Sequence, residues 1–230
     1  MQTTFIFCHI PKTAGTSLRS ALEANFKPHE ILPDKALMYR NGGKYPLTEP
    51  MLEIYKYQGE NVRLIVGHYN FAVKKSLADM KHADMKCIVV LREPIARAIS
   101  HIHHVMHKDG VSKSDVLAAL DAGRMAPRVR PNVMTWVMGN KFGDNAVNQK
   151  SLDNAIKNLR SVDFLGTVEN IQPLVEKLAN FGLPIELGVH NKTPKGIDLE
   201  LTDRQMDTLR IHHRFDIDLY AEARAILDEV

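Results

Sequence analysis

The residues with the clearest chemical potential form a polar turn after the first apolar run of the chain. Positions 5–18 read Phe-Ile-Phe-Cys-His-Ile-Pro-Lys-Thr-Ala-Gly-Thr-Ser-Leu. The apolar start is typical of a buried strand, and the hydroxyl residues fall where a helix would begin. The N–H groups and positive dipole end of such a helix favour an oxyanion. We expect a bound phosphate or sulfate at Lys12, Thr13, Ala14, Gly15, Thr16 and Ser17, with Pro11 and Gly15 permitting the turn.

The order of residues in this turn differs from that of nucleoside-triphosphate loops, in which a lysine directly follows the last glycine. Here Lys12 precedes Gly15. The sequence Pro-Lys-Thr-Ala-Gly-Thr-Ser after a strand resembles the 5′-phosphosulfate loop of sulfotransferases that use 3′-phosphoadenosine 5′-phosphosulfate (PAPS). The resemblance is greatest to the carbohydrate branch that contains the uronyl 2-O-sulfotransferases. It implies PAPS as a co-substrate held by residues 12–17.

A second motif follows another apolar run, Cys87 to Leu91, which predicts a buried strand. Arg92 ends this strand, and an amphipathic helix begins after Pro94. Arg92 and Ser100 have the spacing of the sulfotransferase signature that binds the 3′-phosphate of PAPS, which the resemblance implies here. An arginine suits this role because it can hold two phosphate oxygens at once. The alternative is an ion pair between Arg92 and Glu93 or another carboxylate, with Ser100 in solvent.

A candidate base follows a third apolar segment, Val62 to Val66, which is continued by Gly67 and His68. Ligands of open α/β sheets bind beyond the strand ends, and an imidazole can accept a proton near neutral pH. The Gly-His pair resembles the catalytic-base position of the uronyl sulfotransferases. The resemblance implies that His68 takes the proton of the acceptor hydroxyl. The alternative is a hydrogen-bonded structural histidine.

Two later segments complete the resemblance. Residues Asp163 to Val168 predict a strand, and similar blocks lie near the adenine end of the co-substrate site in these sulfotransferases. Lys192 and Lys195 belong to a polar, basic loop, and a late basic loop often closes over the nucleotide phosphates in this family. The alternatives are simple sheet packing for the strand and solvated side chains for the two lysines.

The order of predicted elements indicates an α/β fold, because short apolar strands alternate with amphipathic helices. The chain has 230 residues, of which 44% are hydrophobic, and this suffices for one core. We expect a single domain over residues 1–230, with a central, mainly parallel sheet flanked by helices in a P-loop-like sulfotransferase arrangement. Helix caps are predicted at Ser112 or Ser114, at Ser151, and at Thr202 with Gln205.

Two segments have little regular pattern, residues 27–59 and 123–150, which contain several prolines. Irregular segments carry specificity in many enzymes. Acceptor specificity would lie there: Arg124, Arg128 and Arg130 could meet an acidic acceptor, and Trp136 could stack on a ring. The favoured interpretation of these side chains is a solvated loop with scattered core aromatics.

Charge, cysteine content and hydropathy indicate which other classes of protein the sequence does not resemble. The formal net charge is +3, which suits an anionic co-substrate without requiring nucleic acid. Cys8 and Cys87 fall inside predicted strands and give neither a disulfide framework nor a zinc spacing. The sequence contains no long apolar run and no secretory leader pattern, so we expect no membrane span and a cytoplasmic location.

A histidine cluster, His101 to His107, offers pairs one helical turn apart. Such pairs can bind a metal, but the run supplies no acidic third ligand. We expect no metal, and instead histidines that line a polar face or the acceptor cleft.

These inferences converge on a PAPS-dependent sulfotransferase with Lys12 and His68 as catalytic residues. The expected reaction is in-line transfer of the sulfuryl group to a hydroxyl of a carbohydrate or small molecule. One alternative is a catalytically silent nucleotide- or glycan-binding module with the same fold. Another is a P-loop kinase-like phosphotransferase, which would need a lysine after the last loop glycine and a strand-end aspartate for magnesium. The acceptor and the oligomeric state stay open.

Overall fold

The computed structural model describes residues 3–33, 61–68, 70–72, 74, 84–140, 144–188 and 199–229. Lys192 and Lys195 lie outside these residues. Within them the strands form one five-stranded sheet in the order β2-β3-β1-β4-β5, and every pair is parallel. The predicted α/β class with a parallel sheet is confirmed. The strands are β1 (Thr4–Cys8), β2 (Ile31–Pro33), β3 (Leu64–Gly67), β4 (Met85–Leu91) and β5 (Phe164–Thr167).

The register of the sheet brings three strand ends together. β1 lies between β3 and β4, and Cys8 pairs with both Gly67 and Val89. β1 and β3 are buried on both faces, as their apolar sequences predict. Phe5 and Phe7 point into one core and Ile6 and Cys8 into the other. The segments that follow β1, β3 and β4 therefore emerge side by side.

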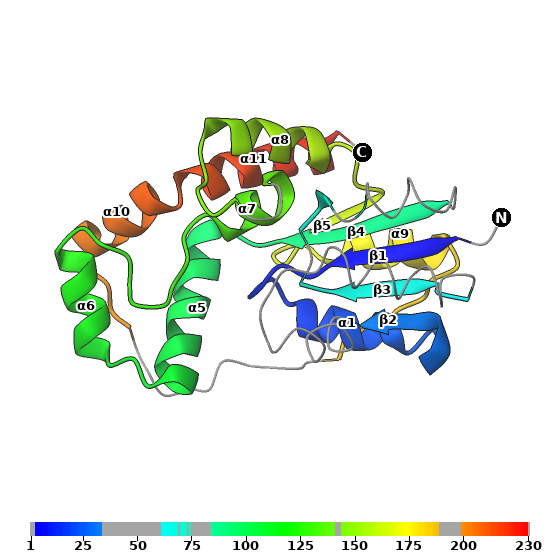
Figure 1. Cartoon of the computed structure of the whole chain (residues 1–230), viewed down its shortest axis with the longest axis horizontal. Helices are drawn as coiled ribbons and strands as arrows, with labels where there is room; N and C mark the ends of the chain where they lie inside the picture. Colours follow the sequence, from blue (N-terminus) through cyan, green and yellow to red (C-terminus); the bar gives the residue numbers. More distant parts are fainter. Residues whose placement is uncertain are drawn as a thin grey trace.

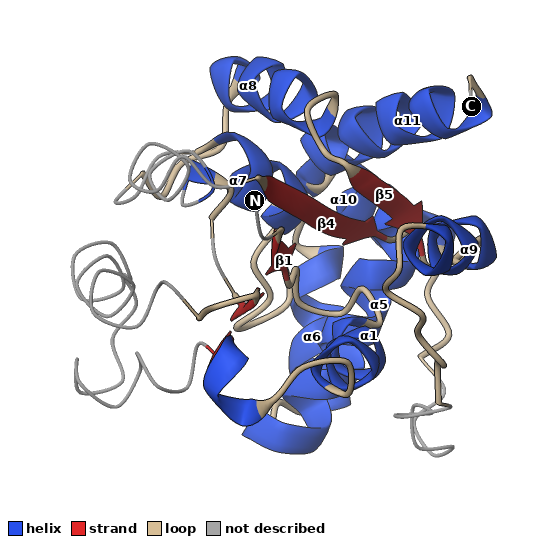
Figure 2. Cartoon of the chain, turned by 90° about the vertical axis from the view of Figure 1, so that its right-hand side faces the viewer, coloured by secondary structure: helices blue, strands red, loops and turns tan. Residues whose placement is uncertain are grey.

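Helices cover both faces of the sheet (Figure 1). One face packs against α1 (Gly15–Glu23) and α9 (Gln172–Asn180). The other face packs against α7 (Val133–Gly139), α8 (Gln149–Leu159) and α11 (Arg214–Asp228). Figure 2 shows α8 and α11 on one side of β4 and α1 on the other.

A third apolar cluster lies beside the sheet (Figure 1). It joins α5 (Pro94–Asp109), α6 (Lys113–Asp121) and α10 (Asp203–His212). None of the described helices is both long and apolar enough to cross a membrane.

The predicted helix caps are confirmed at two of three positions. The Ser112 side chain accepts from the backbone N–H of Asp115, and Thr202 with Gln205 forms a capping box. The predicted cap at Ser151 is wrong, because Asn148 caps α8 and Ser151 stands three residues inside it.

The two segments predicted to be irregular contain regular structure. Residues 28–30 form a 3-10 turn that leads into β2, and residues 133–139 form α7. All of α7 except Trp136 is buried. The prediction for these two parts is therefore wrong, and residues 132–140 of the second segment belong largely to the core.

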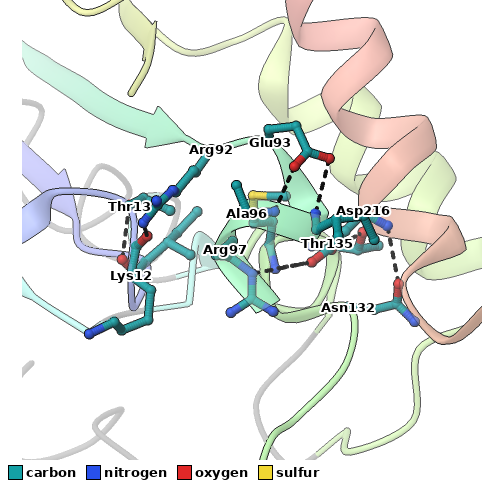
Figure 3. Close-up of polar contacts among 12 residues, drawn as sticks. Lys12, Thr13, Arg92, Glu93, Ala96, Arg97, Asn132, Thr135 and Asp216 are labelled. Carbon is teal, nitrogen blue, oxygen red and sulfur yellow. Dashed lines mark hydrogen bonds and ion pairs between the residues drawn. The ribbon is translucent and has the colours of Figure 1, made fainter. Parts of the chain in front are cut away.

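One buried ion pair ties three helices together (Figure 3). Arg97 on α5 and Asp216 on α11 are both fully buried, and Arg97 Nε lies 3.8 Å from Asp216 Oδ2. The same carboxylate accepts from the N–H groups of Met134 and Thr135 and from the Thr135 hydroxyl. It thereby caps the first turn of α7. This pair fixes α5, which carries one side of the candidate site.

Acid is expected to destabilise the fold through His213, which is fully buried. Burial and then the charge of Arg97 lower the pKa of His213 to about 3. An unfolded histidine has a pKa near 6.5, so below that pH the unfolded state binds a proton that the folded state excludes. The contribution of neutral His213 is complete above pH 6.5 and is lost at up to about 1.4 kcal/mol per pH unit as the pH falls toward 3.

Urea unfolding at pH 7, 6 and 5 measures this effect in the wild type and in His213→Leu. As the pH is lowered from 7 to 5, the free energy of unfolding of the wild type should decrease more steeply than that of the variant. His107→Leu, on the exposed side of α5, is the matched control and should keep the wild-type slope. Equal slopes for the wild type and His213→Leu would contradict the assignment.

Candidate functional site

The turn between β1 and α1 has an unusual backbone. Lys12 (φ 69°) and Ala14 (φ 56°) are both in the left-handed region, which few non-glycine residues adopt and which concentrates at functional sites. Thr13 stands between them, is buried, and donates its hydroxyl to the carbonyl oxygen of Ile10 at 2.9 Å. Backbone N–H groups in turns of this kind form concave anion sites.

The predicted role of Gly15 in this turn is corrected by these angles. Gly15 is not among the left-handed residues; it begins α1 as a buried helical residue. A methyl group built at position 15 would lie 1.9 Å from Cδ2 of His9. Glycine is therefore needed at position 15 because the His9 ring lies close to its Cα atom. It is not needed for a left-handed backbone conformation.

The start of α1 favours an external anion. Its N-cap is Ala14, which offers no side-chain acceptor, and its first turn has no acidic residue. Thr16 is exposed there and Ser17 is half-buried. Because the dipole of a helix is positive at this end, an oxyanion beside the turn would be stabilised.

Arg92 binds the same turn from the end of β4. Its Nη1 donates to the backbone carbonyl oxygen of Lys12 at 3.2 Å (Figure 3). The neighbouring carboxylate of Glu93 accepts from the N–H groups of Ile95 and Ala96 at 3.0 and 2.6 Å, so it caps α5. The alternative of an ion pair between Arg92 and Glu93 is therefore wrong.

The site carries positive charge without matching carboxylates. Within the described ranges, neither Lys12 nor Arg92 has an ion-pair partner. Burial and then the charge of Arg92 lower the pKa of Lys12. Burial also lowers the pKa of Arg97. The charge of Asp216 opposes this shift, and the charge of Arg92 adds to it. Figure 3 shows Arg92 over the backbone of Lys12, whereas Arg97 lies buried beside Asp216.

Arg97 was not predicted from the sequence. All three of its guanidinium nitrogens are buried without a hydrogen-bond partner in the described part of the chain. Its sequence signal is a charged residue among the buried positions of an amphipathic helix, between Ile95 and Ala98. Ser100 lies one turn further along α5 and is half-buried.

His68 directly follows β3, on the other side of β1 from Arg92. Its side chain is half-buried, and its Nδ1 lies 2.7 Å from the carbonyl oxygen of His9. The two rings stack with their centroids 4.2 Å apart. The predicted base and the predicted oxyanion turn therefore meet at His9, which sequence reasoning missed although it stands just before the turn.

A small cavity of about 60 Å³ adjoins the turn on the side of β5. Its wall includes Val168, from the block expected near adenine, and Ile171, three residues further along the chain. The full lining is Thr13, Ala14, Ser17, Leu18, Val90, Val168, Ile171 and Leu187. A larger cavity of about 430 Å³ lies at the starts of α8 and α11 and contains none of the predicted site residues.

The histidines of α5 extend the site. The ring centroids of His101 and His104 are 6.4 Å apart. Burial, then the charges of Arg97, His104 and Lys12, lower the pKa of His101 to about 4. This ring is therefore neutral at pH 7. Among the described residues, no three His, Cys, Asp or Glu side chains gather as metal ligands.

Trp136 and Arg130, two candidates for contact with the acceptor, contact each other. The Arg130 guanidinium lies 4.0 Å from the centroid of the Trp136 ring, and the indole N–H donates to the carbonyl oxygen of Asp144. One face of Trp136 is therefore already covered by Arg130.

Comparison of the sequence with protein-family models and with curated proteins gives no match. The assignment of the site therefore rests on its own residues.

Proposed function

We propose that this protein is a sulfotransferase that moves the sulfuryl group of PAPS to a hydroxyl of a carbohydrate or small molecule. The observation that carries the proposal is the group formed by Lys12 and Arg92. Both cations lie beside a strained turn and a helix N-terminus, and neither has a carboxylate partner among the described residues. A co-substrate with a 5′-phosphosulfate and a 3′-phosphate supplies the negative charge that this group lacks.

The residues fit this co-substrate in defined roles. The N–H groups around Gly15 to Ser17 would hold the 5′-phosphate, and Arg92 with Ser100 would hold the 3′-phosphate. Arg92 suits a phosphate because its carboxylate neighbour is engaged in capping α5. Lys192 and Lys195 remain proposed phosphate ligands, although they lie outside the described residues. The apolar cavity beside Val168 is the proposed binding site of the adenine ring, and it would have to widen to hold this ring.

The reaction is an in-line displacement at sulfur. A bond forms between the acceptor oxygen and sulfur while the bond from sulfur to the bridging phosphate oxygen breaks, and 3′-phosphoadenosine 5′-phosphate (PAP) leaves. His68 takes the acceptor proton at Nε2, because its Nδ1 is engaged with the carbonyl oxygen of His9. Lys12 stabilises the negative charge that grows on the bridging oxygen.

The kinase-like alternative has less support. It needs a carboxylate at a strand end to hold magnesium. The end of β4 carries Arg92, and the carboxylate that follows it caps a helix. The silent binding module is compatible with the same contacts of Lys12, His68 and Arg92, and only turnover distinguishes it from an enzyme.

Calorimetric titration with PAP tests the proposed co-substrate. We expect binding in the micromolar range, about −8 kcal/mol, and no comparable binding of ATP with magnesium. Arg92→Ala should abolish the heat of PAP binding, because it removes the proposed 3′-phosphate ligand. Arg128→Ala is the matched control, since Arg128 is exposed and pairs with Asp109. Absence of PAP binding, or a preference for ATP with magnesium, would refute the proposal.

A further inference from the structure

We infer that His9 is a positioning residue, whose buried ring sets the orientation of His68 and couples it to the oxyanion turn. The catalytic consequence of this inference rests on the proposed function. The contacts themselves do not, because they connect three elements of the fold: the end of β1, the end of β3 and the start of α1.

The backbone of His9 fixes which nitrogen of His68 carries a proton. The N–H of His9 donates to the carbonyl oxygen of Gly67 at 2.9 Å, so His9 extends the pairing of β1 with β3. The carbonyl oxygen of His9 lies 2.7 Å from Nδ1 of His68. A carbonyl oxygen can only accept, so Nδ1 bears the hydrogen. The neutral ring then takes up a further proton at Nε2, as a base requires.

The ring of His9 holds the plane of His68. His9 stacks on His68 at 4.2 Å between centroids and on Phe7 at 5.6 Å, with interplanar angles of 29° and 11°. The three rings therefore form a row, anchored in the core by Phe7, which is 1% exposed. Rotation of the His68 ring out of this row would lose both the stacking and the hydrogen bond to the His9 carbonyl.

The edge of the His9 ring that carries Cδ2 and Nε2 lies against Gly15 in the oxyanion turn. A methyl group at position 15 would lie 1.9 Å from Cδ2 and 2.0 Å from Nε2 of His9. Gly15 is not in the left-handed region, so only this contact demands a glycine. A displacement of the first turn of α1 toward the ring would move His9, and His9 would move His68.

His9 is suited to this role and not to that of the base. It is 8% exposed and enclosed by Phe7, Gly15 and His68, whereas His68 is half-buried. An acceptor hydroxyl therefore reaches His68 before it could reach His9. His9 acts through its neighbour, in the way that a metal ligand or catalytic histidine is oriented by a further group.

Nitrogen-15 NMR of the histidine rings tests the positioning without any substrate. In the wild type at pH 8, His68 should show the signature of a ring protonated at Nδ1. His9→Ala keeps the backbone carbonyl oxygen but removes the stacking that holds the His68 ring against it, so it should give a mixture of both tautomers. His9→Phe, which keeps a flat ring, should preserve the wild-type signal. Gly15→Ala should also give a mixture, because it displaces the same ring without deleting it. A His68 ring protonated at Nε2 in the wild type, or unchanged in both alanine variants, would overturn the inference.

Kinetics separate positioning from a general loss of structure. His9→Ala should lower kcat by about 100-fold, as expected for a misplaced catalytic group, with the KM for PAPS unchanged. His9→Phe should retain most of the rate. Equal losses in the alanine and phenylalanine variants would show that the flat ring is not what matters, and would overturn the inference.

A double substitution tests the coupling to the turn. Gly15→Ala alone should weaken PAP binding, because the added methyl group pushes the turn away from His9. Addition of His9→Ala makes room for this methyl group, so the double variant should regain PAP affinity while kcat stays low. A double variant that binds PAP as weakly as Gly15→Ala alone would contradict the contact. A wild type that neither binds PAP nor turns over would refute the proposed function alone, since the NMR result would still decide the role of His9.

Discussion

His68→Ala is expected to lower the rate of sulfuryl transfer by between about 10²-fold and 10⁴-fold, the usual contribution of a positioned general base. The affinity for PAP should stay unchanged, since His68 follows β3 whereas the proposed phosphate ligands follow β1 and β4. A loss of rate that is confined to kcat indicates that the removed interaction is made in the transition state.

Initial rates with PAPS and a panel of hydroxyl acceptors, together with calorimetry of PAP binding, measure the two effects. His107→Ala is the matched control, because it removes an exposed histidine from α5. A variant at position 68 with the full rate would make the base assignment wrong. A wild type that binds PAP without any turnover would favour the silent binding module.

The strands and the strand-end residues were predictable because their patterns are local. Apolar runs became β1, β3 and β4, which are four to seven residues long. A polar residue directly after such a run must lie at the carboxyl edge of a parallel sheet, where ligands bind. The sequence therefore predicted where Lys12, His68 and Arg92 stand, and the strand order brings them together.

The backbone of the turn was not predictable by the same means. Glycine is the usual residue in the left-handed region, so Gly15 was the expected pivot. The left-handed residues are instead Lys12 and Ala14, which the surrounding contacts hold there. The requirement for glycine at position 15 comes from the ring of His9, a contact between the turn and the strand end before it. Single-residue preferences carry no information about such a contact.

Short elements were missed for a related reason. The three-residue β2 ends in Pro33, which is compatible with an edge strand that pairs on one side only. The seven-residue α7 follows Pro127 and Pro131, which indicate a turn. The helix itself is too short for its apolar residues to show a helical period. Its first turn is fixed by the carboxylate of Asp216, more than eighty residues away in the sequence.

The buried ion pair between Arg97 and Asp216 is expected to be strongly asymmetric. Burial raises the pKa of Asp216, but the charge of Arg97 and three hydrogen bonds from the start of α7 favour its ionised form. Arg97 has no hydrogen bond of its own in the described part of the chain, and Arg92 adds a like charge. Asp216 is therefore well satisfied without Arg97, whereas Arg97 depends on Asp216.

Asp216→Ala should consequently lower the free energy of unfolding by about 3–5 kcal/mol, the cost of leaving one buried charge without its partner. It also leaves the N–H groups of Met134 and Thr135 without an acceptor. Arg97→Met should cost clearly less, because the carboxylate keeps those donors. Asp207→Ala, which breaks an exposed pair with Arg210, is the control and should stay within about 1 kcal/mol. Urea unfolding of the three variants measures the order, and an equal or greater loss in Arg97→Met would show that Asp216, and not Arg97, is the dependent partner.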